Sequence, residues 1–117
     1  MPLTDEARDR ALLAIFAGPL IITLVDREGQ QPQYGGYQAQ PITLGLPYTE
    51  DGGRWLTNEG EVRFPPVTAD GERPLAFWVL RDATGAALAS DELENPQAVR
   101  VGQVPLLPPG AIAVGLT

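Results

Sequence analysis

The densest cluster of apolar residues in the chain lies in residues 62–88. Residues 75–80 are all apolar, and successive side chains of an extended strand point to opposite sides. Because both sides would be apolar, the pattern predicts a strand that is covered on both faces. Asp82-Ala83-Thr84-Gly85 begins with Asp and ends with Gly, which is typical of a tight turn. Residues 86–90 then return as a partner strand, so we expect a β-hairpin that buries Trp78.

Residues 1–16 have the spacing of one amphipathic helix. Thr4 is placed as an N-cap, and Asp5 and Glu6 follow in the first turn, where the helix dipole favours negative charge. Gly18 and Pro19 end the helix, because Gly suits a C-terminal cap and Pro cannot continue it. The apolar residues that share one face are Ala7, Ala11, Leu12, Ile15 and Phe16.

Residues 11–25 contain no charged side chain, which raises the question of a membrane span. This run is shorter than the ~18 residues that a spanning helix needs, and Gly18-Pro19 interrupts it. Acidic residues precede it, whereas a signal peptide begins with basic ones. We therefore expect neither a membrane helix nor a signal peptide.

The remaining strands are shorter and less regular. Residues 20–25 are bulky on both faces, which predicts a central strand. Residues 36–46 alternate as a half-buried strand, with Pro41 favouring an edge or a bulge. Residues 54–57 and 61–64 are expected to form a small hairpin across Asn58-Glu59-Gly60. Further strands are expected at 98–104 and 111–116, and loops at 26–34, 47–53, 67–74, 91–96 and 105–110.

Length and composition set the fold class. With 117 residues, of which 44% are hydrophobic, the chain forms one domain with a real core. Its 13 glycines and 12 prolines suit many short strands joined by turns. We predict a mainly β protein: an N-terminal helix in residues 1–18 and, in residues 20–117, an antiparallel β-sandwich of jelly-roll or Greek-key type with about seven or eight strands. An open sheet with the helix on one face is the alternative.

Three missing residue types exclude many chemistries. The chain has no His, no Cys and no Lys, and all eight basic residues are Arg. Cys or His zinc sites, Ser-His-Asp triads, cysteine nucleophiles, Schiff-base lysines and P-loop lysines are therefore impossible. The formal charge of −7 argues against binding to nucleic acid, which needs clustered basic residues.

Paired carboxylates are the catalytic device that remains, as in glycoside hydrolysis. The candidates lie in predicted loops or at strand ends without apolar neighbours, so we interpret them as solvated acids rather than groups of raised pKa. Asn58-Glu59-Gly60-Glu61 lacks the spaced pattern of a calcium loop. We therefore expect no catalytic residue, metal or cofactor. The candidate acids are Glu50 with Asp51, Glu59 with Glu61, and Asp91 with Glu92 and Glu94.

Surface contacts are the remaining source of function. Aromatic residues near loops could form a platform for sugars, or they could belong to the core or to an interface; they are Tyr34, Tyr37, Tyr48 and Trp55. Arg54, Arg63 and Arg100 are candidates for pairing with carboxylates of a partner. The apolar stripe in residues 11–16 could bind a partner, or it could cover the protein's own sheet.

The order of these features resembles a family of small tailed-bacteriophage proteins that are commonly labelled phage tail fibre proteins. The resemblance extends along nearly the whole chain, although Asp70-Gly71 stands where the family often has a Trp. The segments that carry it are Gly36-Tyr37, Ile42-Thr43-Leu44-Gly45, Val62-Arg63-Phe64-Pro65-Pro66-Val67-Thr68-Ala69, Asp82-Ala83-Thr84-Gly85, Gly102-Gln103 and Gly110-Ala111-Ile112-Ala113-Val114.

The resemblance implies a non-enzymatic structural role in the virion. The protein would be made in the bacterial cytoplasm and would pack on the capsid or tail as a decoration, cement or fibre-type subunit. Its partners would be other virion proteins and further copies of itself, with a trimer as the family-level expectation. A carbohydrate-binding module is the alternative function, and a carboxylate hydrolase is a third.

Overall fold

The computed structural model describes residues 3–31, 34–71 and 73–117. Residues 1–2 of the predicted helix, 32–33 of the predicted loop 26–34 and residue 72 of the loop 67–74 lie outside this description. The fold is mainly β, with 43% of the described residues in strands and 10% in helix, as predicted. Helix α1 (Asp5–Ile15) begins where expected, because the Thr4 hydroxyl accepts a hydrogen bond from the Ala7 amide.

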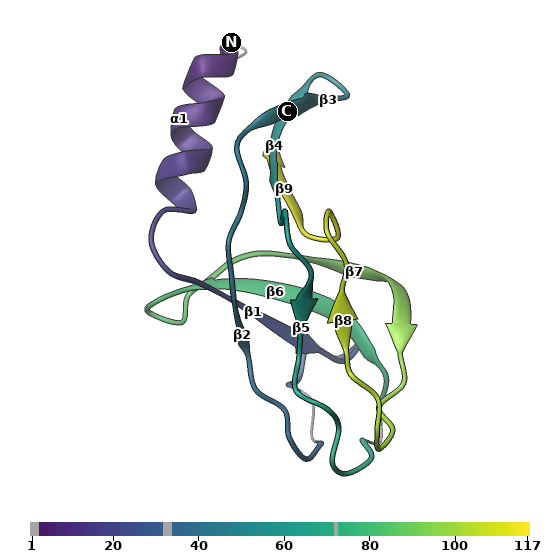
Figure 1. Cartoon of the computed structure of the whole chain (residues 1–117). Coiled ribbons are helices and arrows are strands. Elements are labelled where there is room, and N and C mark those ends of the chain that lie inside the picture. Colours follow the sequence, from purple (N-terminus) through teal and green to yellow (C-terminus); the bar gives the residue numbers. More distant parts are fainter. Residues whose placement is uncertain (1–2, 32–33, 72) are drawn as a thin grey trace.

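The first layer is a four-stranded antiparallel sheet with the order β2-β1-β6-β7 (Figure 1). As predicted, the apolar residues of β1 place it inside this sheet, and Pro41 lies on its edge, where the missing amide costs no ladder bond. The strands are β1 (Leu20–Val25), β2 (Gln40–Ile42), β6 (Leu75–Asp82) and β7 (Ala87–Gln97).

The second layer is a long antiparallel ribbon with one interruption. β4 pairs with β9 and β5 pairs with β8, while β3 adds to the outer side of β4. Because β5 follows β4 and β9 follows β8, the two pairs lie along one line, which crosses the direction of β1 and β6 in Figure 1. These strands are β3 (Tyr48–Glu50), β4 (Gly53–Thr57), β5 (Val62–Arg63), β8 (Leu106–Leu107) and β9 (Ala113–Leu116).

The hairpin of β6 and β7 is confirmed. Asp82 closes its turn, since one carboxylate oxygen accepts hydrogen bonds from the amides of Thr84 (2.9 Å) and Ala86 (3.1 Å). Gly85 has φ 88°, which a side chain would oppose. Trp78 is buried as expected, but Phe77 and Val79 remain partly exposed. The prediction that β6 is covered on both faces is therefore only partly right.

The core lies between the two layers. The four-stranded sheet contributes mainly aliphatic residues and Trp78, and the ribbon contributes Phe64 and further aliphatic residues. The two layers together bury the apolar surface that neither could bury alone, which is the basis of a sandwich. The strand orders do not establish the predicted jelly-roll connectivity, so that part stays a prediction. The largest fully buried side chains include Phe64, Leu12, Ile22, Leu24, Leu56, Leu75, Leu80, Leu107 and Ile112.

The predicted hairpin between residues 54–57 and 61–64 is wrong. β4 pairs with β3 and β9, and β5 pairs with β8, so β4 and β5 do not pair with each other. The predicted loop 47–53 contains β3, which forms a hairpin with β4 across Asp51-Gly52. Asp51 with φ 49° and Gly52 with φ 75° supply the two left-handed residues of that turn.

Three predictions about the C-terminal third also need correction. The predicted loop 91–96 belongs to β7. The pairing is irregular there, because two residue steps on β6, from Phe77 to Leu75, lie opposite five steps on β7, from Glu92 to Gln97, so the residues between Glu92 and Gln97 bulge. Residues 98–104 form no strand; their apolar alternation places Val99 in the core but leaves the next valine exposed. Residues 105–110, predicted as a loop, contain the strand β8. It is limited to Leu106–Leu107, which lie between prolines and pair with β5.

Two further strands are shorter than predicted. Within residues 36–46, only β2 pairs over several residues, and Leu46 is 82% exposed rather than half-buried. The last strand, predicted at 111–116, is β9, and its alternation is confirmed because Ile112 and Val114 are buried.

Asn58 occupies the interruption in the ribbon. It is 1% exposed, and its side-chain amide donates to the carbonyl oxygens of Gly60 (2.8 Å) and Pro108 (3.0 Å). Its side-chain oxygen accepts a hydrogen bond from the Ile112 amide at 2.9 Å. Its own carbonyl accepts one from the Gly110 amide at 2.9 Å. Asn58 therefore joins the two parts of the ribbon and replaces the ladder bonds missing there.

Replacing Asn58 with Ala should destabilise the fold strongly. The change leaves one amide and two carbonyls without their side-chain partner at a buried position, and we expect a loss of about 3 kcal/mol in the free energy of unfolding. Urea unfolding of Asn58→Ala measures it. Asn95→Ala is the matched control, because Asn95 is exposed. Equal stability of the two variants would show that Asn58 does not hold the ribbon together.

Candidate protein-interaction surface

Helix α1 is held against the ribbon by polar contacts of Asp9 and Arg8. The Arg54 guanidinium of β4 donates to both carboxylate oxygens of Asp9, at 2.7 and 2.8 Å, and to the Thr49 hydroxyl at 2.7 Å. The hydrogen bond from Arg54 holds the pKa of Asp9 below its ordinary value and raises that of Arg54. Arg8 donates to the Gly52 carbonyl at 2.7 Å and also pairs with Asp5. These contacts fix α1 against the β3–β4 hairpin.

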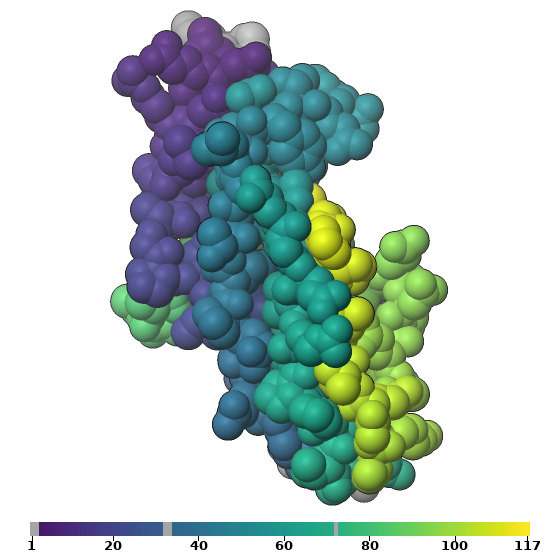
Figure 2. All heavy atoms as spheres, viewed as in Figure 1, coloured from purple at the N-terminus to yellow at the C-terminus, as the bar shows by residue number. Residues whose placement is uncertain are grey.

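Only a small part of α1 is buried. Leu12 is its single fully buried residue among those described, whereas Leu13 is 51% and Ile15 is 49% exposed. In Figure 2, α1 and the β3–β4 hairpin form one end of an elongated molecule that measures 49 × 28 × 25 Å. The radius of gyration, 15.2 Å, exceeds the roughly 13 Å of a compact domain of this length. The shape therefore presents much surface for contacts.

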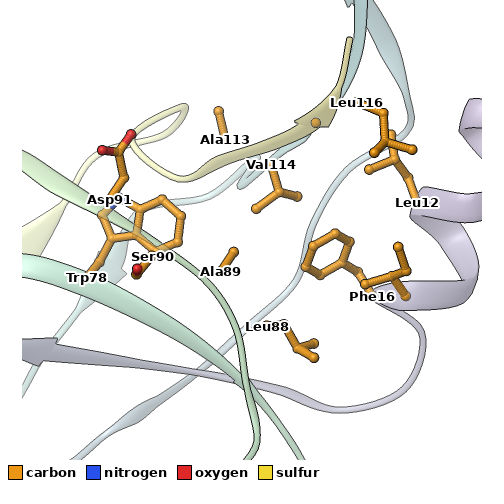
Figure 3. A pocket seen from close by; sticks show the side chains of 12 residues that line it. Leu12, Phe16, Trp78, Leu88, Ala89, Ser90, Asp91, Ala113, Val114 and Leu116 are labelled. Carbon is orange, nitrogen blue, oxygen red and sulfur yellow. The ribbon is translucent and has the colours of Figure 1, made fainter. Parts of the chain in front are cut away.

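A hollow of about 330 Å³ lies between α1, β7 and β9. Figure 3 shows Phe16, Trp78, Ala89 and Val114 around it, and Ile15 also contributes to the lining. On the other flank of α1, a smaller hollow of about 160 Å³ includes Leu13 in its lining. Exposed apolar residues therefore border a hollow on either side of the helix.

Two more hollows continue the first one along β7. One of about 360 Å³ lies between residues 92–97 and residues 106–111. Another of about 310 Å³ lies between residues 96–98 and 103–105. We call this line of three hollows the β7–β9 seam; its two walls are residues 88–98 and, running the opposite way, residues 103–116. In Figure 2, light green β7 lies beside the yellow strands β8 and β9.

The charged residues that line the β7–β9 seam are all acidic. They are Asp91, Glu92 and Glu94, and no arginine is among the lining residues that the structure describes. Glu92 has one exposed partner, Arg27, at 3.6 Å. Residues 91–96 were predicted as an acidic loop, so the sequence indicated these charges but not the strand that carries them.

Tyr34 and Tyr37 belong to the core and its border. Their rings meet edge to face at 5.5 Å between centroids, and Tyr37 stacks on Phe64 at 6.2 Å. The Tyr37 hydroxyl accepts a hydrogen bond from the Leu24 amide at 3.2 Å. The pairing of β1 with β2 covers only residues 20–22 of β1, so Leu24 lies past the end of β2. Burial raises the pKa of Tyr34 to about 12, and its hydroxyl has no hydrogen-bond partner among the described residues. Neither ring offers an open platform for a sugar.

Tyr48 and Trp55 face each other across β3 and β4, and both are partly exposed. The Trp55 indole donates to the Glu50 carbonyl at 3.0 Å. Its ring lies over Gly115, where a Cβ would come within 2.3 Å of it, so β9 needs glycine there. These two are the aromatic candidates that remain at the surface, at the same end as α1.

The three candidate arginines lie apart in their contacts. Arg54 pairs with Asp9, as described above, and Arg63 pairs with Glu61 at 2.8 Å. Arg100 donates to the Val99 carbonyl at 3.2 Å. The structure thus places each of them in a contact within the chain and does not gather them into one cluster.

Two further properties bear on function. In residues 3–31, 34–71 and 73–117, no group of three or more acidic side chains is arranged to hold a metal ion. Within the same residues, no helix has both the length and the apolar character needed to cross a membrane. No family model, curated protein or solved structure matches the chain.

Removing the charge of Asp9 should loosen α1. Asp9→Asn loses the ion pair with Arg54, so we expect a melting temperature a few degrees lower at pH 7. Because the folded pKa of Asp9 lies below its ordinary value of 3.8, its stabilising effect is complete above that pH and disappears as pH falls through the folded pKa. The difference between the wild type and Asp9→Asn should therefore shrink in strong acid.

Glu6→Gln is the matched control for this experiment. It removes a carboxylate from the same helix, but the pair of Glu6 with Arg10 is largely exposed. Melting curves followed by circular dichroism between pH 7 and pH 2 measure both variants. If Glu6→Gln lowers the melting temperature as much as Asp9→Asn, the Asp9–Arg54 pair is not what holds α1.

Proposed function

We propose that the protein is a non-enzymatic structural subunit of a tailed-phage virion that packs on the capsid or tail surface through protein–protein contacts. The observation that carries the contact function is the exposed apolar surface of α1, where Leu13 and Ile15 each border a hollow. An apolar surface of this kind gains free energy when a partner covers it. The assignment to a virion rests on the resemblance of the sequence.

Composition supports the same proposal. Without His, Cys or Lys, the chain lacks the side chains of most nucleophilic and general-base mechanisms. Its 12 prolines restrict the loops, and a restricted loop loses less entropy when it is ordered in an interface. Many copies on a particle surface, as homo-oligomers with the trimer as one form, would use these properties directly.

A carbohydrate-binding module is the second candidate. Tyr48 and Trp55 favour it, because they lie side by side on one face of the β3–β4 hairpin and remain partly exposed. Aromatic faces combined with nearby carboxylates such as Glu50 suit sugar hydroxyls and rings. Tyr34 is buried, and the ring of Tyr37 packs against Tyr34 and Phe64, which limits the platform to this one pair.

Charge introduced at Leu13 should reduce the amount of protein on the particle. Leu13→Asp places a carboxylate where we expect apolar contact, and Ala14→Asp places the same charge at the exposed neighbouring position. We expect about tenfold less Leu13→Asp than Ala14→Asp on gradient-purified particles, which corresponds to about 1.4 kcal/mol of contact energy. Quantitative mass spectrometry measures the copies, and circular dichroism confirms that both variants fold.

Two results would contradict the proposal. Absence of the wild-type protein from purified particles would exclude a virion role. A glycan-array signal that Trp55→Ala abolishes would favour the carbohydrate-binding module instead.

A further inference from the structure

The β7–β9 seam lies between free strand edges. β7 is the last strand in the order β2-β1-β6-β7, and β9 is the last in β3-β4-β9. β8 has β5 as its only strand partner among the described strands. The outer backbone groups of these edges therefore have no strand to pair with in the part of the chain that the structure describes. Unpaired edges of this kind are templates for an added strand.

The seam also has an apolar floor and defined ends. Trp78, Leu88 and Val114 line it near α1, and the helix closes that end with Leu12 and Phe16 (Figure 3). Between the second and third hollows, the Gln97 side-chain amide donates to the Leu106 carbonyl at 3.1 Å and bridges the two walls, so the continuous stretch of the first two hollows ends there. An added segment would thus cover apolar side chains along one face while its backbone meets the strand edges.

The dimensions favour an extended segment. The three hollows follow β7, whose residues 87–97 pair alongside residues 81–75 of β6, a length of roughly 20 Å at about 3.3 Å per residue. A chain of about seven residues in extended form matches that length, whereas a compact small molecule would fill only one hollow. Alternate side chains of such a segment would point to the floor and to solvent.

The charge of the seam decides which segment fits. Asp91, Glu92 and Glu94 line the β7 wall, and none of the described lining residues is basic. A second copy of the chain would bring a formal charge of −7 against these acids, which opposes self-association at this surface. A segment with arginine or lysine at its outward positions would instead be attracted.

We infer that the β7–β9 seam binds an extended, cationic segment of a partner protein, in which apolar residues alternate with arginine or lysine, and that this segment adds as a strand to the free edges. The inference rests on the proposed contact function and names the partner's chemistry. Its apolar residues cover the exposed parts of Ile15, Phe16 and Leu88 near α1. Its basic residues pair with Asp91 and Glu94. Binding of this kind closes the open side of the sandwich.

Synthetic peptides test the inference on the purified full-length protein. The probe is a fluorescent seven-residue peptide in which valine alternates with arginine, and fluorescence anisotropy measures its affinity. Two further peptides serve as comparisons: one with glutamate in place of arginine, and one cationic peptide with N-methyl groups on alternate amides, which blocks strand pairing. We expect the cationic peptide to bind at least about tenfold more tightly than either, and to weaken as salt rises.

Hydrogen exchange and charge variants locate the binding. The bound peptide should slow amide exchange in residues 87–97 and 113–116, where strand edges gain partners. Asp91→Asn combined with Glu94→Gln should weaken binding about fivefold. The matched control, Glu50→Gln combined with Asp51→Asn, removes two acids from the β3–β4 hairpin and should leave the affinity unchanged.

Several outcomes would overturn the inference. Equal affinity for the cationic and N-methylated peptides would exclude strand addition, and protection outside the two edges would place the site elsewhere. A dimer of the chain alone, detected by light scattering and dissolved by the peptide, would identify a second copy as the natural occupant. If the cationic peptide does not bind but particles carry the normal number of copies of the protein, the inference fails and the proposed function stands. If the peptide binds but the protein is not incorporated into particles, only the proposed function fails.

Discussion

The fold depends on how one buried amide is satisfied. Asn58 lies where the ribbon would otherwise lose its ladder, and it supplies two donors and one acceptor to segments near residues 60, 108 and 112. A buried polar side chain is tolerated only when its hydrogen bonds are made, so these partners must all be in place together. The same contacts let the ribbon continue past the break, from β4 and β9 to β5 and β8, and cross the whole four-stranded sheet.

This arrangement explains why one side of the sandwich stays open. The ribbon covers the sheet with paired strands in its middle, but β7 and the β8–β9 wall end as neighbouring free edges. Gln97 bridges them between the second and third hollows, and α1 covers the end near β9 mainly through Leu12. The Asp9–Arg54 pair fixes α1 from the far side, so the helix borders the seam without filling it.

Sequence reasoning succeeded where the signal is local. Thr4 and its acidic neighbours define the helix start, and Asp82 with Gly85 define the hairpin turn, because each makes its contacts within four residues. It failed where pairing is distant: Leu106–Leu107 pairs with Val62–Arg63, and Asn58 looked like a hairpin turn residue. The aromatic candidates were selected by residue type alone. The position of Tyr37 depends on a distant contact, because its hydroxyl accepts a hydrogen bond from the Leu24 amide. The seam consists largely of backbone edges, which no residue type marks.

In this topology, the acidic residues on β7 bear on self-association as well as on partner binding. Free strand edges invite pairing between copies of the same chain, and charged residues on an edge oppose it. Asp91, Glu92 and Glu94 lie on the longest free edge of the described strands, and like charges on a second copy would repel them. In the proposed binding mode, the charges that oppose pairing of two copies at this edge attract a basic segment instead, so one set of side chains both protects the edge and selects what pairs with it.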